Sequence, residues 1–395
     1  MDSTPSFSLQ RAPKWLLALL PLLLLLALIA GFLLLNPLSF FSGAFPPLEQ
    51  LNVQRITLPA RDQIRLEVIN GGPDPVSIAQ VIVDEALWQF TMTPPGPLGR
   101  LRTAVIDIPY PWVAGEPLPI DLVTSTGLTF PANIDVAVQS PAVDGRTLLA
   151  YGLLGIYVAV IPVALGMLWY PFMRRVDRKW MNAILALTIG LLVFLFVDMV
   201  LEALELAGEA PAVFQAVPVV IFGILLSLGV LLAVGRRSGE QTPLRVATLI
   251  ALGIGLHNLG EGLAIGAAFA GGSAALGSFL VIGFTLHNIT EGVGIAAPLT
   301  RGERPTLRVF LLLALLAGGP AIIGTWIGGL AFSPFMAALF LAIGAGAILQ
   351  VIWEVGKLLT RDARREGGTA FTWLNFGGVV AGVLIMYLTA FLVKF

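Results

Sequence analysis

A succession of long apolar segments restricts the fold of this chain more than any other feature. Eight of them follow Arg146, at about residues 147–170, 181–207, 211–235, 244–270, 274–299, 306–332, 334–359 and 370–393. Each is long enough to cross a bilayer as a helix, which takes about 20 apolar residues. With 57% hydrophobic and only 12% charged residues, the chain is expected to be an all-α polytopic membrane protein rather than a soluble enzyme.

Basic residues follow every second segment and predict the topology. They are Arg174, Arg175, Arg178 and Lys179, then Arg236, Arg237 and Arg245, then Arg301, Arg304 and Arg308, and finally Lys357, Arg361, Arg364 and Arg365. The alternate connections, at 207–210, 271–273 and 332–334, carry none. Because basic loops stay in the cytoplasm, we expect a multi-pass protein of the cell membrane. Residues 46–146 and the C-terminal Phe395 would then be extracytoplasmic.

Residues 1–45 are interpreted as a cytoplasmic tail followed by a signal anchor. The apolar run Trp15–Leu35 is long enough to span a bilayer and follows Arg11 and Lys14. Ser42-Gly43-Ala44 could instead end a cleaved signal peptide. We prefer the anchor, because the run is longer than the apolar region of a usual signal peptide.

Residues 46–146 have a different character and predict a small extracytoplasmic domain resembling a β-sandwich. Short stretches such as Ile64–Ile69 alternate polar and apolar residues, and breakers such as Asn70–Pro73 and Pro94–Pro97 separate them. The domain contains no His or Cys, and Met92 is its only methionine. We therefore interpret it as a structural or partner-binding cap that transport does not require.

The two histidines of the chain each open a copy of the motif His-Asn-x-x-Glu-Gly, at His257–Gly262 and His287–Gly292. On a helix of about 100° per residue, His and Glu four residues apart lie on one face and can hold one divalent cation. A second cation could lie between Glu and Asn, with the carboxylate bridging. Ionisable groups inside a membrane are costly and usually mark an ion pathway.

The alternative for this motif is a set of polar residues that join helices. Two copies containing every histidine of the chain favour a metal site. The chain has no cysteine, so the ligands would be nitrogen and oxygen. Glycines such as Gly262, Gly292 and Gly324 crowd the fourth to sixth segments, and small residues let helices approach closely enough to share an ion.

Further polar groups lie at membrane depth on other segments. Asp198, Glu202 and Glu205 form an acidic stripe on the second segment, which could pass cations inward, although a solvated helix end explains Glu205 as well. Gln350 and Glu354 lie four residues apart on the seventh segment and could line an exit. An ordinary ion pair of Glu354 with a nearby lysine is equally compatible with the sequence.

The eight segments, the outward termini and the motif on both the fourth and the fifth segment resemble the ZIP family of divalent metal transporters. The resemblance covers about residues 147–395. It implies an eight-helix bundle with a transport site between helices four and five, used for zinc and in some members for iron, manganese or cadmium. By position, His257, Glu261, His287 and Glu291 match the primary site. Asn258 and Asn288 match the neighbouring positions, which complete a binuclear centre in the family.

The sequence departs from the family where a second ion would bind. Asn288 stands where some bacterial members have Asp, and Gly319 precedes Pro320 where they have Glu. Both changes remove negative charge, so we expect one tight ion. The connection Arg236–Gln241, often His-rich in the family, contains no histidine.

The leading hypothesis is therefore uptake of Zn²⁺, or of Fe²⁺, Mn²⁺ or Cd²⁺, as transported substrate rather than cofactor. A membrane sensor or scaffold is the second hypothesis. An intramembrane metalloenzyme is the third and least favoured, because His-Glu-x-x-His is absent and the motif order is His-x-x-x-Glu. Expected partners are the metal ion, the lipid bilayer, an unidentified extracytoplasmic partner and, as one option, a second copy in a homodimer. The net charge of -1 argues against nucleic acid.

Overall fold

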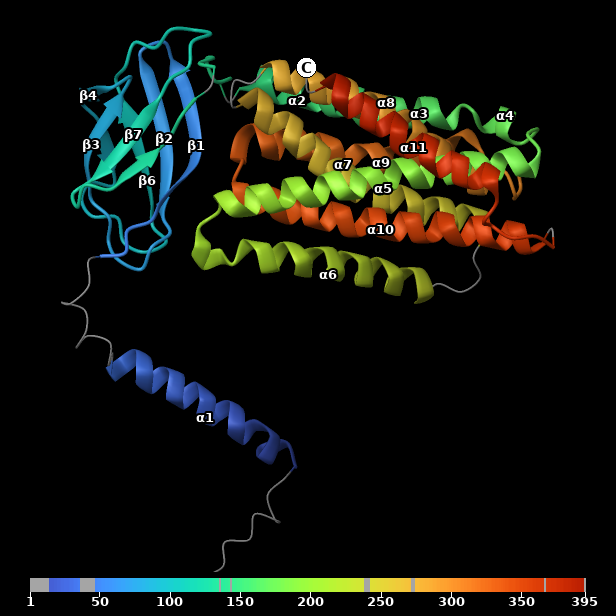
Figure 1. Cartoon of the computed structure of the whole chain (residues 1–395), viewed down its shortest axis with the longest axis horizontal. Coiled ribbons are helices and arrows are strands. Elements are labelled where there is room, and N and C mark those ends of the chain that lie inside the picture. The colour runs from blue at the N-terminus through green and yellow to red at the C-terminus, as the bar shows by residue number, and fades with distance from the viewer. Residues whose placement is uncertain are drawn as a thin grey trace, which may run out of the picture. The chain divides into compact units, whose positions relative to one another are not determined.

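The computed structural model describes residues 14–35, 47–134, 136–142, 144–237, 242–270, 274–365 and 367–393 (Figure 1). The chain divides into two compact units, Met1–Leu48 and Glu49–Phe395. The first contains helix α1 (Lys14–Leu35), which covers the predicted anchor segment and has Pro21 inside it. The alternative signal-peptide end at Ser42–Ala44 and the C-terminal Phe395 lie outside the described residues.

All eight predicted membrane segments are helical. The first segment consists of α2 (Gly145–Gly155), the π-helical turn η3 (Ile156–Val160), α3 (Ile161–Met167) and α4 (Tyr170–Met173). The second is α5 (Arg178–Glu209), and the third is the short η4 (Ala212–Phe214) with α6 (Ala216–Arg237). The remaining five are α7 (Pro243–Ala270), α8 (Ala274–Leu299), α9 (Leu307–Ala331), α10 (Pro334–Arg365) and α11 (Trp373–Val393). Among the described residues of the chain, seven segments are long and apolar enough to cross a membrane, and the apolar stretch of α11, Trp373–Leu388, is shorter.

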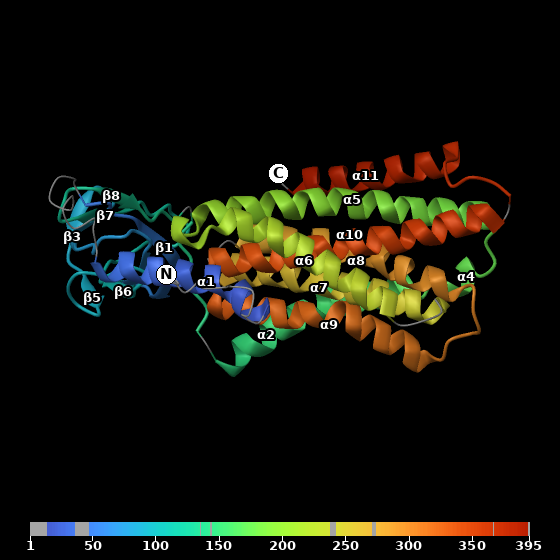
Figure 2. The same ribbon diagram turned by 90° about the horizontal axis from the view of Figure 1, so that it is seen from below.

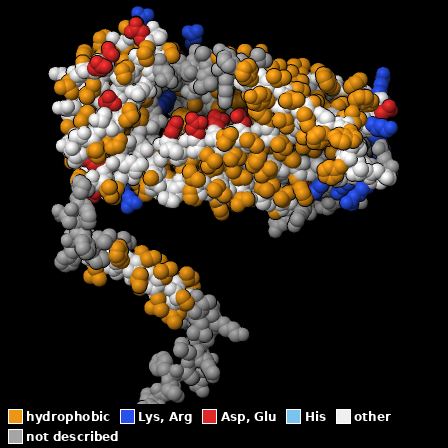
Figure 3. All heavy atoms as spheres, in the orientation of Figure 1, with side chains coloured by type: hydrophobic (Ala, Val, Ile, Leu, Met, Phe, Trp, Pro, Cys, Tyr) orange, Lys and Arg blue, Asp and Glu red, His pale blue; other side chains and the backbone are white. Residues whose placement is uncertain are grey.

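The helices run side by side as one bundle. Figure 2 shows α11 and α5 along one side of it and α9 with α2 along the other. Hydrophobic side chains cover the lateral surface in Figure 3, and Lys and Arg gather at the end away from the strands. Leu201, Phe222 and Leu312 are each more than 60% exposed. This distribution is typical of a bundle surrounded by lipid.

The strands of the second unit form the predicted sandwich. They are β1 (Leu51–Ala60), β2 (Gln63–Asn70), β3 (Ile78–Val83), β4 (Ala86–Trp88), β5 (Thr91–Thr93), β6 (Thr103–Ile108), β7 (Ile120–Thr124) and β8 (Thr129–Pro131). One antiparallel sheet has the order β1-β2-β6-β5 and the other β4-β3-β7-β8. Leu66 and Ile106 of the first sheet share one buried core with Val81 and Leu122 of the second.

The glycine that ends each His-Asn-x-x-Glu-Gly motif lies where two helices touch backbone to backbone. A methyl group on Gly262 of α7 would overlap the backbone of Ala321 on α9. A methyl group on Gly292 of α8 would overlap the carbonyl of Val163 on α3, and Gly166 of α3 lies equally close to α8. The predicted role of glycine in close helix packing is therefore confirmed, and it fixes α7 and α8 against their outer neighbours.

We predict that Gly292→Ala destabilises the folded protein, because α8 and α3 must separate to admit the methyl group. Overpacking of this kind costs about 1–3 kcal/mol. Thermal unfolding in detergent measures the effect. Gly319→Ala on α9 is the matched control, since a Cβ atom there meets nothing within 4 Å. Equal unfolding temperatures for the two variants would contradict the packing argument.

Candidate metal centre

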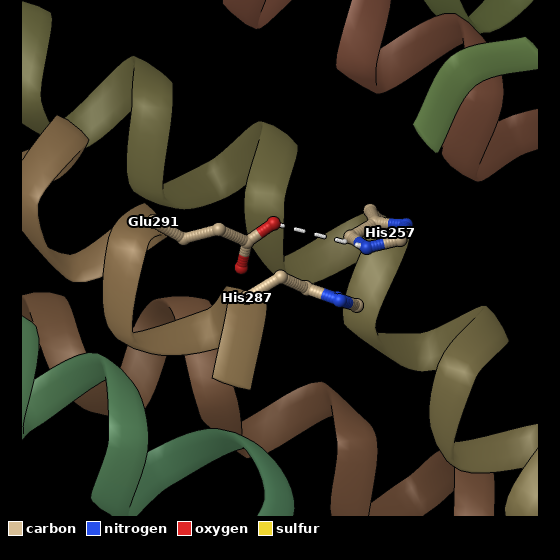
Figure 4. A group of neighbouring side chains, drawn as sticks. All are labelled: His257, His287 and Glu291. Atoms are coloured by element: carbon tan, nitrogen blue, oxygen red, sulfur yellow. Dashed lines mark ion pairs between the residues drawn. The ribbon is translucent and has the colours of Figure 1, made fainter. Parts of the chain in front are cut away.

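The six polar residues of the two motifs lie together inside the bundle. Three come from the middle of α7 and three from α8. All six are buried: His257, Asn258 and Asn288 are 0% exposed, Glu261 and Glu291 3%, and His287 6%. Figure 4 shows the side chains of His257, His287 and Glu291 converging from the two helices. The helix geometry expected from the motif spacing is thus present, and it brings both copies to one place.

Glu261 lies between the two imidazoles. Its Oε1 atom is 2.8 Å from Nε2 of His257, four residues earlier on the same helix. The same oxygen contacts Nε2 of His287 on α8. The imidazole centroids are 6.1 Å apart. One carboxylate and two imidazoles from two membrane helices therefore direct their ligand atoms at a common point.

Glu291 brings a second carboxylate to this point. One ligand atom each from Glu291, His257 and His287 lie within 4.8 Å of one another, and Oε1 of Glu291 is 3.8 Å from Nε2 of His257. Both of its carboxylate oxygens are buried and accept no hydrogen bond from the described residues. A cavity of about 10 Å³ borders Glu291 and His287 on the α5 side. That volume holds about one water molecule. Buried carboxylate oxygens without a donor are costly, and a cation would satisfy them.

Asn258 and Asn288 each use their amide nitrogen to hold a neighbouring helix. Nδ2 of Asn258 donates to the carbonyl of Ala317 on α9 at 3.0 Å. Nδ2 of Asn288 donates to the carbonyl of Val158 in η3 at 3.0 Å and to Oε2 of Glu261 at 3.1 Å. The Oδ1 atoms of both residues are buried and lack a hydrogen-bond partner among the described residues. The asparagines therefore do join neighbouring helices, as the alternative interpretation of the motifs expected. Their side-chain oxygens remain able to contact a cation.

A proline explains why the carbonyl of Val158 can accept this bond. In an α-helix it would accept from the N–H group four residues later, but that residue is Pro162, which has none. The π-helical turn Ile156–Val160 lies at the same place, and such turns often occur at functional sites. The first segment thus supplies an acceptor that positions Asn288.

No model of a known protein family matches this sequence, and no curated protein matches it significantly.

The structure adds Met199, which the sequence analysis did not single out. Its Sδ atom on α5 lies 3.0 Å from Nδ1 of His257, the nitrogen that faces away from Glu261. Met199 is 3% exposed. A methionine in an apolar helix usually fills the core, so the sequence contains no signal for this contact. With it, the centre is surrounded by three helices, α5, α7 and α8.

The predicted pathway residues lie on either side of this centre. Asp198 on α5 is exposed and Glu202 partly buried. Gln350 of α10 is 0% exposed, and both polar atoms of its amide lack a hydrogen-bond partner among the described residues. Glu354 is 3% exposed and forms a 3.0 Å ion pair with Lys357. The ion pair considered for Glu354 is therefore present, and Gln350 lies between it and the level of His257 along the bundle.

We predict that Asn288→Asp destabilises the metal-free protein and that divalent metal restores its stability. The new carboxylate would replace a donor 3.1 Å from Glu261 and 3.0 Å from a carbonyl oxygen. Three buried carboxylates repel one another until a cation binds, and binding to the native state raises the unfolding temperature.

Thermal unfolding of both proteins with and without Zn²⁺ measures the effect. Asn375→Asp on α11 is the control. It loses a comparable hydrogen bond, from the side-chain amide to the carbonyl of Ala370, outside the motifs. A metal-induced shift no larger in Asn288→Asp than in the unmodified protein would contradict the arrangement.

Proposed function

We propose that this protein carries a divalent metal cation across the membrane and that His257, Glu261, His287 and Glu291 bind it during passage. The observation that supports this most directly is the buried group of His257, His287 and Glu291, whose ligand atoms lie within 4.8 Å of one another. Glu261, also buried, contacts both imidazoles. Ionised carboxylates and neutral imidazoles give these four residues a charge of about −2, which one divalent cation balances.

The ligand chemistry fits Zn²⁺ among several divalent ions. Imidazole nitrogen with carboxylate oxygen suits Zn²⁺ and also Fe²⁺ and Mn²⁺, and the absence of cysteine excludes thiolate ligands. The resemblance of the paired motif to the ZIP family supports the same group of ions and an inward direction of transport, from the sandwich end to the basic end. On that path the acidic stripe on α5 precedes the centre, and Gln350 and Glu354 follow it.

One tightly bound ion is expected at a time. The amides of Asn258 and Asn288 add no charge, and Gly319 adds no side chain where some bacterial members of the family have a glutamate. A second divalent cation would leave a charge of about +2 in the low-dielectric interior, which is strongly unfavourable.

We predict that His257→Ala and Glu261→Gln each abolish high-affinity uptake of radioactive Zn²⁺ into proteoliposomes containing purified protein. Each variant removes a ligand, so too few remain to replace the hydration water of the ion. Gly319→Ala, which adds a methyl group in open space, should transport normally.

This assay also separates the transporter from the sensor or scaffold and from the metalloenzyme. Unmodified protein that binds Zn²⁺ but moves none would contradict transport. Normal uptake by both ligand variants, at equal protein incorporation, would show that the ions cross elsewhere.

We further predict that uptake weakens as the pH falls, because the metal ligands must be deprotonated to bind. Protons and metal compete for the same imidazoles and carboxylates. At high pH the ligands are free to bind, and at low pH each binding event must release protons. Uptake measured between about pH 5 and 8 with the same pH on both sides tests this. A flat profile would show that protonation of the histidines is not linked to metal binding.

A further inference from the structure

The β-sandwich is attached to the ends of several helices by its first strand. The guanidinium of Arg55 in β1 donates to the carbonyls of Leu330 and Gly329 at 2.6 and 3.1 Å. These carbonyls lie in the last turn of α9, the negative end of the helix dipole, where a cation is stabilised. Asn52 of the same strand donates to the carbonyl of Glu209 at the end of α5 at 3.3 Å. The sandwich therefore contacts helices on both sides of the bundle.

A cavity of about 700 Å³ lies between the sandwich and these helices. Its walls include Arg55 and Asn133 from the sandwich, Glu202 and Glu209 from α5, and Ala267 from α7. A divalent cation with six water molecules needs roughly 200 Å³, at about 30 Å³ for each water. The cavity therefore has room for a hydrated cation and further water.

The charges on the wall of this cavity favour a cation. Glu202 and Glu209 oppose a single positive group, Arg55, among the charged side chains that line it in the described residues. The charge of Arg55 is directed at the carbonyls of α9, which offset part of its field. In Figure 3, acidic side chains form a row along the helices beside the sandwich. A wall with excess negative charge raises the local concentration of cations.

The floor of the cavity lies one side chain away from the metal centre. Leu263 and Leu341 line it. Cδ2 of Leu341 would lie 3.2 Å from a Cβ atom on Gly260, the residue before Glu261. An ion that left this cavity inward past α5 would therefore meet the first carboxylate of the centre.

We propose that this cavity is the outer vestibule of the transport path and that the sandwich is a functional wall of it. The proposal rests on the transport function proposed above. A hydrated divalent cation enters between the sandwich and α5, is held loosely by Glu202 and Glu209, and loses water when it reaches Glu261. This role is an alternative to the expectation that transport does not require the domain.

Thiol chemistry tests the vestibule, because the protein has no cysteine and only an introduced thiol can react. Ala267→Cys places the thiol on the cavity wall, and Ala264→Cys, on the same wall, repeats the test. Ala79→Cys, exposed on β3 outside the cavity lining, is the matched control. Each variant is reconstituted at full length, treated from outside with a cationic or a neutral methanethiosulfonate, and assayed for uptake of Zn²⁺ below saturation.

The cationic adduct at Ala267→Cys should slow uptake by about tenfold, the neutral methyl adduct should slow it much less, and neither should change uptake by Ala79→Cys. Equilibrium affinity for Zn²⁺ should stay unchanged, because the adduct blocks access and not the ligands. The vestibule alone would be overturned if Ala267→Cys and Ala264→Cys, fully modified, transported at the unmodified rate. It would also be overturned if the adduct lowered the affinity for Zn²⁺ as much as it lowered uptake. An unmodified protein that moves no metal would overturn the transport function and the vestibule together.

Discussion

The balance of buried charge governs the rest of this structure. Glu261 and Glu291 are almost completely buried in a bundle whose outer surface is apolar. Two ionised carboxylates cannot remain uncompensated there, because the desolvation of each costs several kcal/mol. Two protons or one divalent cation can neutralise them, and His257 and His287 are placed to accept either. Under the proposed function, binding of the metal exchanges protons for one divalent cation.

The remaining motif residues hold the helices that carry these groups. In both copies the asparagine donates to a carbonyl of an adjoining helical segment, and the glycine lets a backbone approach that same part of the bundle. On α7 the partner is α9, and on α8 it is the first segment at η3 and α3. The candidate ligands therefore project from helices that are fixed by backbone contacts.

The sequence was sufficient to predict the helical segments, the sandwich and the meeting of the two motifs. The helical segments and the sandwich depend on hydrophobic periodicity, which is local. The meeting of the two motifs was expected because small residues let helices approach closely. It was not sufficient to predict the contact of Met199 with His257, the bond of Asn288 to Val158 or the attachment of Arg55 to α9. These contacts join residues that are distant in the chain, and nothing in the residue types distinguishes them. The sequence around Arg55 gave no indication that this arginine would cap a membrane helix.

The family resemblance stays a proposal about function, because it depends on two short motifs and the order of the helices. The chemistry of the centre can be examined independently of it. The chain contains only two histidines, and the proposed site uses both to bind the same metal ion.

X-ray absorption spectroscopy of purified protein loaded with one Zn²⁺ per chain, without a histidine tag, tests this claim most directly. We expect nitrogen and oxygen ligands with outer-shell scattering from two imidazoles. Scattering from one imidazole or none, or a spectrum that does not change in the double variant His257→Ala/His287→Ala, would contradict the account.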